Sequence, residues 1–437
     1  MTTLQQLNNF ELDKVHRKIN EEYNKFKAMG IQFNMARGKP APEQLALAEQ
    51  LLNLPGSGNY MASDGADCRN YGGERGLPEA RELMSALVGA PPENTLVEGN
   101  SSLALMHDYL VFSLLRGNSD SLLPWSQEEK IRFLCPVPGY DYHFNMTEEY
   151  GIEMCPVSLD ADGPDMDQVE ELVAEDSSIK GMWCVPKYSN PTGTIYSDSV
   201  IKRLASMTTA APDFRLFWDN AYAVHHLTEK RITIANILDA CESAGHPNRA
   251  LVFASTSKVT FPGGGIAAFA SSTDNLQWFL EKIGKRSIVP DRINQLRHMA
   301  LLPDEQALHA LMDAHRQIID PKFEAVHAAF DRWLTDPTVA NWTRPKGGYF
   351  ISLHTPKGCA RRAVELAEKA GVTMTPAGAA FPYGNDPEDS HLRIAPTFLS
   401  MEEIEQAAEG IALSIRLAVS EKARTKNNLC YPITTPE

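Results

Sequence analysis

The sequence predicts an α/β protein with a mostly parallel sheet of about seven strands between helices, followed by a smaller α+β lobe. Short apolar runs recur between residues 95 and 271, and most are separated by enough chain for a helix, as parallel neighbours require. Beyond Pro303 the pattern changes to long amphipathic stretches, which indicates the second lobe. With 437 residues and 43% apolar content, the chain can bury a core of this size. The apolar runs are TLVEG, IRFLC, GIEMCPV, GMWCVP, FRLFW, ALVFAS and GIAAFAS.

The first predicted element is one amphipathic helix near the amino terminus. Leu12, Val15, Ile19 and Phe26 stand at helical spacing, and Gly30 provides a stop. In the sheet, the gap between ALVFAS and GIAAFAS is too short for a helical crossover. The last strand is therefore predicted to run antiparallel to the rest.

The second lobe is predicted to combine helices with a strand. A long helix is expected from Glu305 through Trp333, followed by a strand at WTRPKGGYFISL. Further amphipathic helices are expected to about Glu421.

Charge and composition exclude several classes of function. A formal net charge of −15 would repel a phosphate backbone, so nucleic acid is not expected as a partner. No run of about eighteen uncharged apolar residues occurs, so no membrane span is expected. The start MTTLQQLNNFELDK lacks the basic flank and apolar region of a secretory signal. These features favour a cytoplasmic address.

The cysteines are expected to be buried, reduced thiols. They are odd in number, form no CxxC pair and mostly sit in apolar segments, so neither a disulfide nor a zinc site is expected. The seven are Cys68, Cys135, Cys155, Cys184, Cys241, Cys359 and Cys430.

Polar residues follow several of the predicted strands, and ligands of open α/β sheets bind at the carboxyl ends of strands. Asn100, Ser101 and Ser102 follow TLVEG and open a helix whose free N–H groups and dipole suit a phosphate. Ordinary helix capping explains the same three residues. Tyr140 follows IRFLC and Asn190 follows GMWCVP, and taken singly they are typical of a packing aromatic and a turn.

The next two strand ends carry ionisable groups, a carboxylate and an amine. Asp219 follows FRLFW with Tyr222 three residues later, although a lone aspartate here is often a helix cap. Lys258 follows ALVFAS, close to Ser255 and before three glycines. A desolvated lysine has the lowered pKa that a nucleophilic amine needs. Together the five strand ends supply a phosphate cradle, an aromatic ring, an amide, a carboxylate and a lysine.

This set matches one ligand, pyridoxal phosphate (PLP), which carries a phosphate, a pyridine ring, a phenolic oxygen and an aldehyde. Tyr140 is expected to stack on the ring, while Asp219 keeps the ring nitrogen protonated. Asn190 and Tyr222 are expected to bond the phenolic oxygen. Lys258 is expected to form the Schiff base and then to move a proton between the substrate and the cofactor.

In this order and spacing, these residues resemble the fold-type-I PLP-dependent aminotransferases, the class I/II superfamily, over nearly the whole chain. The motifs MARGKP, VEGNSSL, CPVPGYDYHF and VPKYSNPTG look like the divergent bacterial aspartate aminotransferases near the MocR-type group. The wider resemblance rests on YGGERGLPEAR with Tyr71, PGYDYHFNMTEEYG with Tyr140, SNPTG with Asn190, DNAY with Asp219 and Tyr222, STSK with Ser255 and Lys258, and HLRIAPTF with Arg393.

The resemblance implies a domain arrangement and an assembly. The small domain would comprise residues 1–50 and 304–437, and the large PLP-binding domain residues 51–303. It also implies a homodimer in which Tyr71 reaches the partner's cofactor phosphate. Arg393 would bind the substrate α-carboxylate with Asn190 close to the substrate, and Gly38 would lie on a segment that closes over it.

Two features depart from the pattern or leave it incomplete. Related enzymes carry an arginine about eight residues after the lysine to neutralise the phosphate, but Gly265 stands at the aligned place here. A dicarboxylic substrate needs a second cation, and the candidates by position are Arg37, Lys39, Arg292 and Arg297, among which the sequence does not choose.

The paired histidines His225 and His226 suggest a metal, but no carboxylate or third ligand stands at suitable spacing, so packing or hydrogen bonding to residues of the site is expected.

Three functions compete on these observations. The first is transamination between L-aspartate and 2-oxoglutarate, by a ping-pong scheme through pyridoxamine phosphate. The second is the same cofactor with aromatic or branched amino acids, or a β-lyase reaction. The third is a PLP-binding regulatory module, which is disfavoured because only about thirty residues precede MARGKP and the chain is acidic. The first is the expected function.

Overall fold

The computed structural model describes residues 4–430, which fold as two compact units. The sheet unit comprises Pro42–Ser189 and Thr194–Arg316. The terminal unit comprises the chain up to Ala41, Asn190–Gly193 and the chain from Gln317 onward. The domain limits expected at residues 50 and 303 stay a prediction.

The sheet unit is built on an eight-stranded sheet with strand order β2-β9-β8-β7-β6-β3-β4-β5. Its middle strands pair in parallel, whereas β9 is antiparallel to both of its neighbours. All seven predicted runs form strands, and the predicted reversal of the last one is confirmed. The strands are β2 (Thr95–Val97), β3 (Arg132–Val137), β4 (Glu153–Asp160), β5 (Gly163–Pro164), β6 (Ile179–Cys184), β7 (Arg215–Asp219), β8 (Ala250–Ser255) and β9 (Ala267–Ala270).

The predicted number of seven strands was one too low. The chain turns back after β4, and Gly163 and Pro164 pair antiparallel with its last residues. A two-residue strand leaves no apolar run, so hydrophobic periodicity has no signal for it.

Two apolar clusters cover the two faces of this sheet. One lies among α3 (Pro78–Val88), α6 (Met166–Glu175), α7 (Asp198–Ser206), α8 (Ile237–Ser243), α10 (Arg292–Leu301) and the start of α11 (Glu305–Trp333), and the other among α4 (Ser102–Arg116), α5 (Asp141–Glu149) and α9 (Thr273–Arg286). Side chains alternate between the clusters along each strand: Leu216 and Trp218 enter the first, and Phe217 enters the second. Both faces are buried, which explains why the strands read as continuous apolar runs.

The sheet unit also contains helices, with the 3₁₀ turns written as η. They are α2 (Pro42–Ala46), η2 (Glu49–Asn53), α3 (Pro78–Val88), η3 (Pro92–Asn94), α4 (Ser102–Arg116), η4 (Trp125–Gln127), α5 (Asp141–Glu149), α6 (Met166–Glu175), α7 (Asp198–Ser206), α8 (Ile237–Ser243), α9 (Thr273–Arg286) and α10 (Arg292–Leu301). The predicted long helix is confirmed as α11 (Glu305–Trp333), and the division between the two units falls within it.

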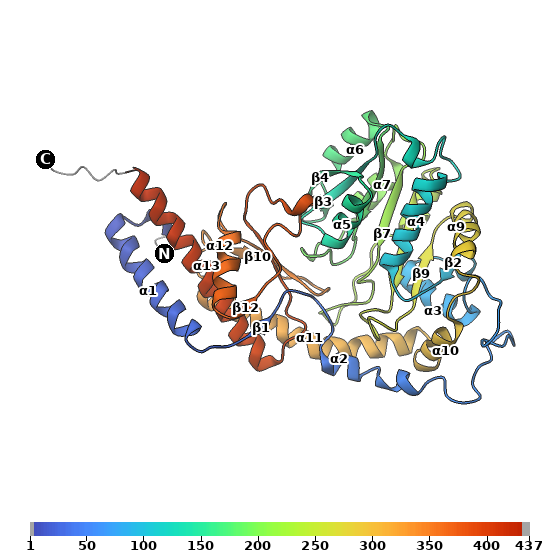
Figure 1. Ribbon diagram of the computed structural model, residues 1–437, viewed down its shortest axis with the longest axis horizontal. Coiled ribbons are helices and arrows are strands. Elements are labelled where there is room, and N and C mark those ends of the chain that lie inside the picture. Colours follow the sequence, from blue (N-terminus) through green and yellow to red (C-terminus); the bar gives the residue numbers. More distant parts are fainter. Residues whose placement is uncertain (1–3, 431–437) are drawn as a thin grey trace. The chain divides into compact units, whose positions relative to one another are not determined.

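The terminal unit packs the first long helix of the chain against the last one (Figure 1). A capping box closes the start of α1, in which Asn8 and Glu11 exchange hydrogen bonds of 3.0 and 3.1 Å. The predicted amino-terminal helix is therefore confirmed, with Leu12, Ile19 and Phe26 buried. The helices of this unit are η1 (Leu4–Gln6), α1 (Asn9–Lys27), α12 (Ala360–Lys369), η5 (Pro382–Gly384) and α13 (Met401–Cys430).

Two small sheets complete the terminal unit. Strands β10 (Asn341–Trp342), β11 (Ile351–His354) and β13 (His391–Ile394) form an antiparallel sheet, and β1 (Phe33–Asn34) pairs in parallel with β12 (Val372–Thr373). The single strand expected at WTRPKGGYFISL is wrong, because only its two ends are extended and they pair with each other as β10 and β11. Pro345 has no N–H to donate, and Gly348 adopts a φ of +84° between them.

Several expectations from composition concern the structure directly. Within residues 4–430, no helix is long and apolar enough to cross a membrane. The six cysteines whose side chains are described are buried and unpaired, and the side chain of Cys430 lies outside the described part. The same part of the chain has no cluster of three or more His, Cys, Asp or Glu placed to hold a metal ion.

Candidate active site

Lys258 lies in a tight turn just beyond β8. The turn is closed by hydrogen bonds from the N–H groups of Val259 and Thr260 to the carbonyl of Thr256, at 2.9 and 2.8 Å. The loss of hydration lowers the pKa of the Lys258 amine below its usual value, although the Asp219 carboxylate acts in the opposite direction. A larger share of this amine is therefore neutral and nucleophilic than in water.

Asp219, the last residue of β7, is buried with one oxygen unpaired. Its Oδ2 lies 3.1 Å from Nε2 of His143, whose ring stacks on Trp183 at 4.4 Å between centroids. Its Oδ1 has no hydrogen-bond partner among residues 4–430. A buried carboxylate oxygen without a donor is costly, so this position suits a ligand that brings an N–H group. The protonated nitrogen of a pyridine ring is such a donor.

Two tyrosines flank the lysine and the carboxylate. Nζ of Lys258 lies 5.0 Å from the ring centre of Tyr222, which is buried three residues after Asp219. Tyr140 stands at the N-cap of α5, and its ring is 4.9 Å from the ring of His143. The structure thus brings the predicted lysine, carboxylate and both tyrosines to one edge of the sheet.

Hydroxyl and amide groups gather at the amino end of α4. Ser101 caps this helix, and its Oγ accepts from the N–H of Ala104 at 3.3 Å. Asn100 donates to the carbonyl of Gly263 at 3.1 Å. Ser257 donates to the carbonyl of Asn100 at 3.3 Å and accepts from Ser255 at 3.1 Å. The positive end of the α4 dipole and these hydroxyls together suit an anion. Ser102 is buried at the first position of the helix.

Gly265 has no space for a side chain. A Cβ atom there would lie 2.9 Å from Oγ1 of Thr256 and 3.2 Å from the carbonyl oxygen of Phe261. Oγ1 of Thr256 is itself fixed, because it accepts from the N–H of Ile266 at 2.9 Å. Close packing therefore excludes an arginine from the position where related enzymes carry one.

Helix α10 holds the loops around this edge. Nδ2 of Asn294 donates to the carbonyls of Gly264 and Gly265, at 3.2 and 2.8 Å. The Gln295 amide receives the N–H of Leu77 at 2.7 Å and donates to the carbonyl of Val97 at 3.0 Å. Helix α10 thereby fixes the loop that contains Gly264 and Gly265, and it also fixes the end of β2.

Arg292 begins the same helix and holds the segment around Tyr71. Its Nη2 donates to the carbonyls of Asp67 at 2.9 Å, of Asn70, and of Tyr71 at 3.4 Å. The Tyr71 side chain itself is 73% exposed. Arg292 therefore serves to support the backbone of this segment.

The other candidate second cations are dispersed. Arg297 donates to the carbonyl of Leu54 at 3.0 Å, so it too supports the backbone. In the terminal unit Arg37 and Lys39 are exposed, and Nζ of Lys39 lies 3.8 Å from the ring centre of Phe398. The second cation is therefore not assigned to any of the four.

The predicted substrate-binding residues lie in the terminal unit. Arg393, on β13, is buried, and its guanidinium approaches Oγ1 of Thr375 at 3.4 Å and Oδ1 of Asn190 at 3.5 Å. It also lies 5.1 Å from the ring centre of Phe350. A Cβ atom on Gly38 would lie 2.5 Å from the same ring, so only glycine fits there. Arg393, Asn190 and Gly38 are thus brought together with Phe350.

Several residues of the site were missed by sequence reasoning. His143, which bonds Asp219, stands three residues after Tyr140, and Ser257 stands between Ser255 and Lys258. His225 was expected to pack or to bond a residue of the site, and its Nε2 lies 3.3 Å from the Lys258 carbonyl, which confirms the second of these. His226 bonds the Tyr188 hydroxyl through Nδ1 at 2.6 Å.

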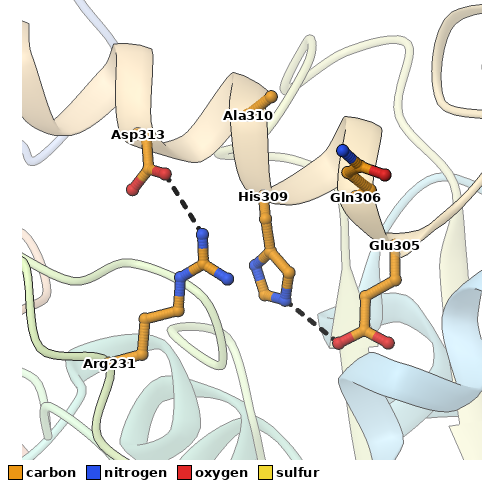
Figure 2. Close-up of a pocket in the computed structure, with 6 residues that line it drawn as sticks. All are labelled: Arg231, Glu305, Gln306, His309, Ala310 and Asp313. Carbon is orange, nitrogen blue, oxygen red and sulfur yellow. Dashed lines mark hydrogen bonds and ion pairs between the residues drawn. The ribbon is translucent and has the colours of Figure 1, made fainter.

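A separate pocket of about 420 Å³ opens on the sheet unit (Figure 2). Figure 2 shows Arg231 paired with Asp313 at 3.1 Å and His309 paired with Glu305 at 3.0 Å. The pocket contains none of the strand-end residues, so it is not the candidate active site.

Comparison with known structures defines the class of the protein. The crystal structure of an α-aminoadipate aminotransferase from Thermus thermophilus, complexed with N-(5'-phosphopyridoxyl)-L-leucine, has the same fold. Its TM-score is 0.72 at 23% identity, covering 92% of this chain and 95% of that chain. The fold is that of the fold-type-I PLP-dependent aminotransferases.

The particular family follows from the sequence. This chain belongs to the aspartate amino-transferase family, whose sequence model matches residues 7–427. An aspartate aminotransferase of Corynebacterium glutamicum is 44% identical over 418 residues, which are 95% of this chain and 96% of that protein. The crystal structure of an aspartate transaminase from Corynebacterium glutamicum gives a TM-score of 0.94 at 44% identity, covering 96% of this chain and 99% of that one. The protein is therefore an aminotransferase, and enzymes of its family depend on PLP.

Proposed function

We propose that this aminotransferase transfers the amino group of L-aspartate to 2-oxoglutarate in two half-reactions, with PLP attached to Lys258. The observation that carries the proposal is the buried Asp219, whose unpaired Oδ1 lies in the same strand-end cluster as a lysine of lowered pKa. The choice of aspartate is supported by the relative of that activity, which is 44% identical over nearly the whole chain.

Residues of the sheet unit would hold the cofactor. Asp219 would accept from the ring nitrogen, and Tyr140 would stack on the ring. Tyr222 would donate to the phenolic oxygen. The contact expected from the sequence between Asn190 and the same oxygen stays a prediction.

The phosphate would be held without the usual arginine. The amino end of α4 offers Asn100, Ser101 and Ser102, and Ser255 adds a hydroxyl from the end of β8. Helix N–H groups and hydroxyl groups can satisfy phosphate oxygens, and the helix dipole offsets part of their charge.

When bound, the cofactor supplies an electron sink that stabilises negative charge at the substrate α-carbon. Lys258 has the catalytic role in this proposal. Its Nζ, which is partly neutral because the loss of hydration lowers its pKa, accepts the proton of the α-carbon once the substrate has displaced it. The negative charge of Asp219 keeps the ring nitrogen protonated throughout.

Arg393 would orient the substrate. A planar guanidinium binds a carboxylate through two parallel hydrogen bonds, and burial strengthens such a pair. The contact of Gly38 with Phe350 allows the amino-terminal segment to pass close to Arg393 in the terminal unit.

The assembly is proposed to be a cytoplasmic homodimer. Tyr71 is a large aromatic residue that is 73% exposed although Arg292 fixes its backbone, and Leu52 and Met61 are also exposed nearby in the chain. A rigid, exposed apolar segment is typical of an interface, which supports a role for Tyr71 in the partner's site.

A single-turnover absorbance titration tests the function. L-Aspartate is expected to shift the absorbance band of the lysine-bound cofactor, and 2-oxoglutarate is expected to restore it. Lys258→Ala should abolish the shift, whereas Lys285→Ala, which changes an exposed lysine of α9, should not. A shift with L-phenylalanine but not with L-aspartate would favour the aromatic alternative, and release of ammonia and pyruvate would favour a β-lyase.

A further inference from the structure

Three buried histidines contact three consecutive residues of the lysine turn. Nε2 of His225 lies 3.3 Å from the carbonyl oxygen of Lys258, and Nε2 of His315 lies 3.0 Å from that of Val259. Nε2 of His298 lies 3.0 Å from Oγ1 of Thr260. The histidines come from the segment after β7, from α11 and from α10 respectively. His225, His298 and His315 are called the histidine cage below.

The hydrogen bonds of His315 define a neutral ring. His315 donates from Nε2 to a carbonyl, and its Nδ1 lies 2.9 Å from the Gln44 amide nitrogen, so Nδ1 accepts. In His298, Nδ1 donates to the carbonyl of Asn294 at 2.8 Å, and Nε2 lies 3.0 Å from the Thr260 hydroxyl, which also contacts the carbonyl of Thr256 at 3.2 Å. A histidinium has two donors and no acceptor, so a protonated His315 would lose its bond from the Gln44 amide.

Burial favours the same neutral state. It lowers the pKa of His315 to about 4, that of His225 well below its usual value, and that of His298 as well. The titratable groups facing His225 are Lys258, His226 and His315. Those facing His298 are Arg297 and Asp291. The cage is thus uncharged at neutral pH.

We propose that the histidine cage positions Lys258 by holding the backbone of residues 258–260 still while the amine moves between its bound and released states. This inference rests on the proposed role of Lys258. Lys258 is half-buried, so a fixed turn keeps Nζ partly shielded from water, and a loosened turn would expose it further. Since the loss of hydration is what lowers the pKa of Lys258, loosening the turn should raise that pKa.

Paired substitutions separate positioning from bulk packing. His315→Leu and His225→Leu remove the N–H donor to the turn, whereas His315→Gln and His225→Gln keep a side-chain amide that can donate to the same carbonyl. His327→Leu and His327→Gln are the matched controls, because His327 lies on α11, is buried, has a pKa lowered to about 4, and belongs to the terminal unit.

The first readout is the pH midpoint for acylation of Lys258 in the full-length protein freed of cofactor, measured by peptide mass spectrometry. Each leucine variant should raise this midpoint by about half a pH unit. At any one pH below the midpoint, the fraction of Lys258 that is neutral should therefore fall about threefold. Each glutamine variant should restore the wild-type midpoint, and both His327 variants should leave it unchanged. The second readout is the pH dependence of the absorbance of the lysine-bound cofactor, which should shift in the same variants.

A second, less disruptive pair of substitutions tests the proposal if the leucine variants do not fold. Thr260→Val keeps the shape of the side chain but removes the hydroxyl that faces His298, and Thr260→Ser restores it. Thr260→Val should raise the midpoint and Thr260→Ser should not. Folded leucine or valine variants with a wild-type midpoint would overturn the proposal. Acylation does not depend on turnover, so a protein that fails to transaminate L-aspartate would refute the proposed function and still report on the cage.

Discussion

The acid stability of the protein should depend on His315. This ring is 1% exposed, and burial lowers its pKa to about 4 from the value of 6.5 that it has in the unfolded chain. Between these two pH values the unfolded state binds the proton and the folded state does not. The contribution of His315 to stability is therefore complete above pH 6.5 and is lost as the pH falls toward 4.

The size of the effect follows from the two pKa values. At pH 5 the unfolded state gains about 2 kcal/mol relative to the folded state through this one ring. His315→Gln cannot titrate, so the loss of unfolding free energy between pH 8 and pH 5 should be about 2 kcal/mol smaller than in the wild type. Comparing differences between two pH values removes any packing cost that the substitution adds equally at both.

Urea unfolding followed by tryptophan fluorescence at pH 8 and pH 5 measures these differences. His309→Gln on the same helix is the control, because His309 lies nearer the surface and is paired with Glu305. The reasoning would be refuted if His315→Gln lost as much unfolding free energy between pH 8 and pH 5 as the wild type and the control do.

Three further substitutions test the site. Asp219→Asn should retain the lysine-bound cofactor but slow single turnover about 10- to 100-fold, because the charge beside the ring nitrogen is lost; an unchanged rate would contradict the role of Asp219. Gly265→Ala should lower the free energy of unfolding by about 1–3 kcal/mol, because the new methyl group would collide with Thr256. Calorimetry measures this loss, and Gly284→Ala is the control because a methyl group there meets open space. Arg393→Lys should raise KM for both substrates about tenfold through loss of the second hydrogen bond; steady-state kinetics with an unchanged KM would exclude substrate contact.

The fold was largely predictable because its signals are local. Each of the seven apolar runs is long enough to show burial on both faces, and the short link after ALVFAS reveals the reversal of β9. The two failures have the same origin. Gly163–Pro164 is too short to form a run, and WTRPKGGYFISL contains a turn at Gly348 that its apolar ends conceal.

The candidate site was predictable only in part. Lys258, Asp219 and Tyr222 could be found because each stands just after a predicted strand, and the carboxyl ends of such strands meet at one edge. His143 and His315 could not be found in this way. His143 bonds a residue 76 positions away, and His315 bonds one 56 positions away. A lone histidine in a helix carries no local sign of its distant partner.

By itself, the sequence determined the class of fold, the positions of seven strands along the chain and the reactive groups at their ends, because apolar periodicity and residue type are properties of short segments. Only the tertiary structure decided that Asp219 keeps one oxygen unpaired, that Gly265 leaves no space for an arginine, and that neutral histidines hold the lysine turn. A shift of less than one ångström between two segments makes or breaks a hydrogen bond or a steric contact. Because these segments lie far apart in the chain, no local pattern encodes their separation.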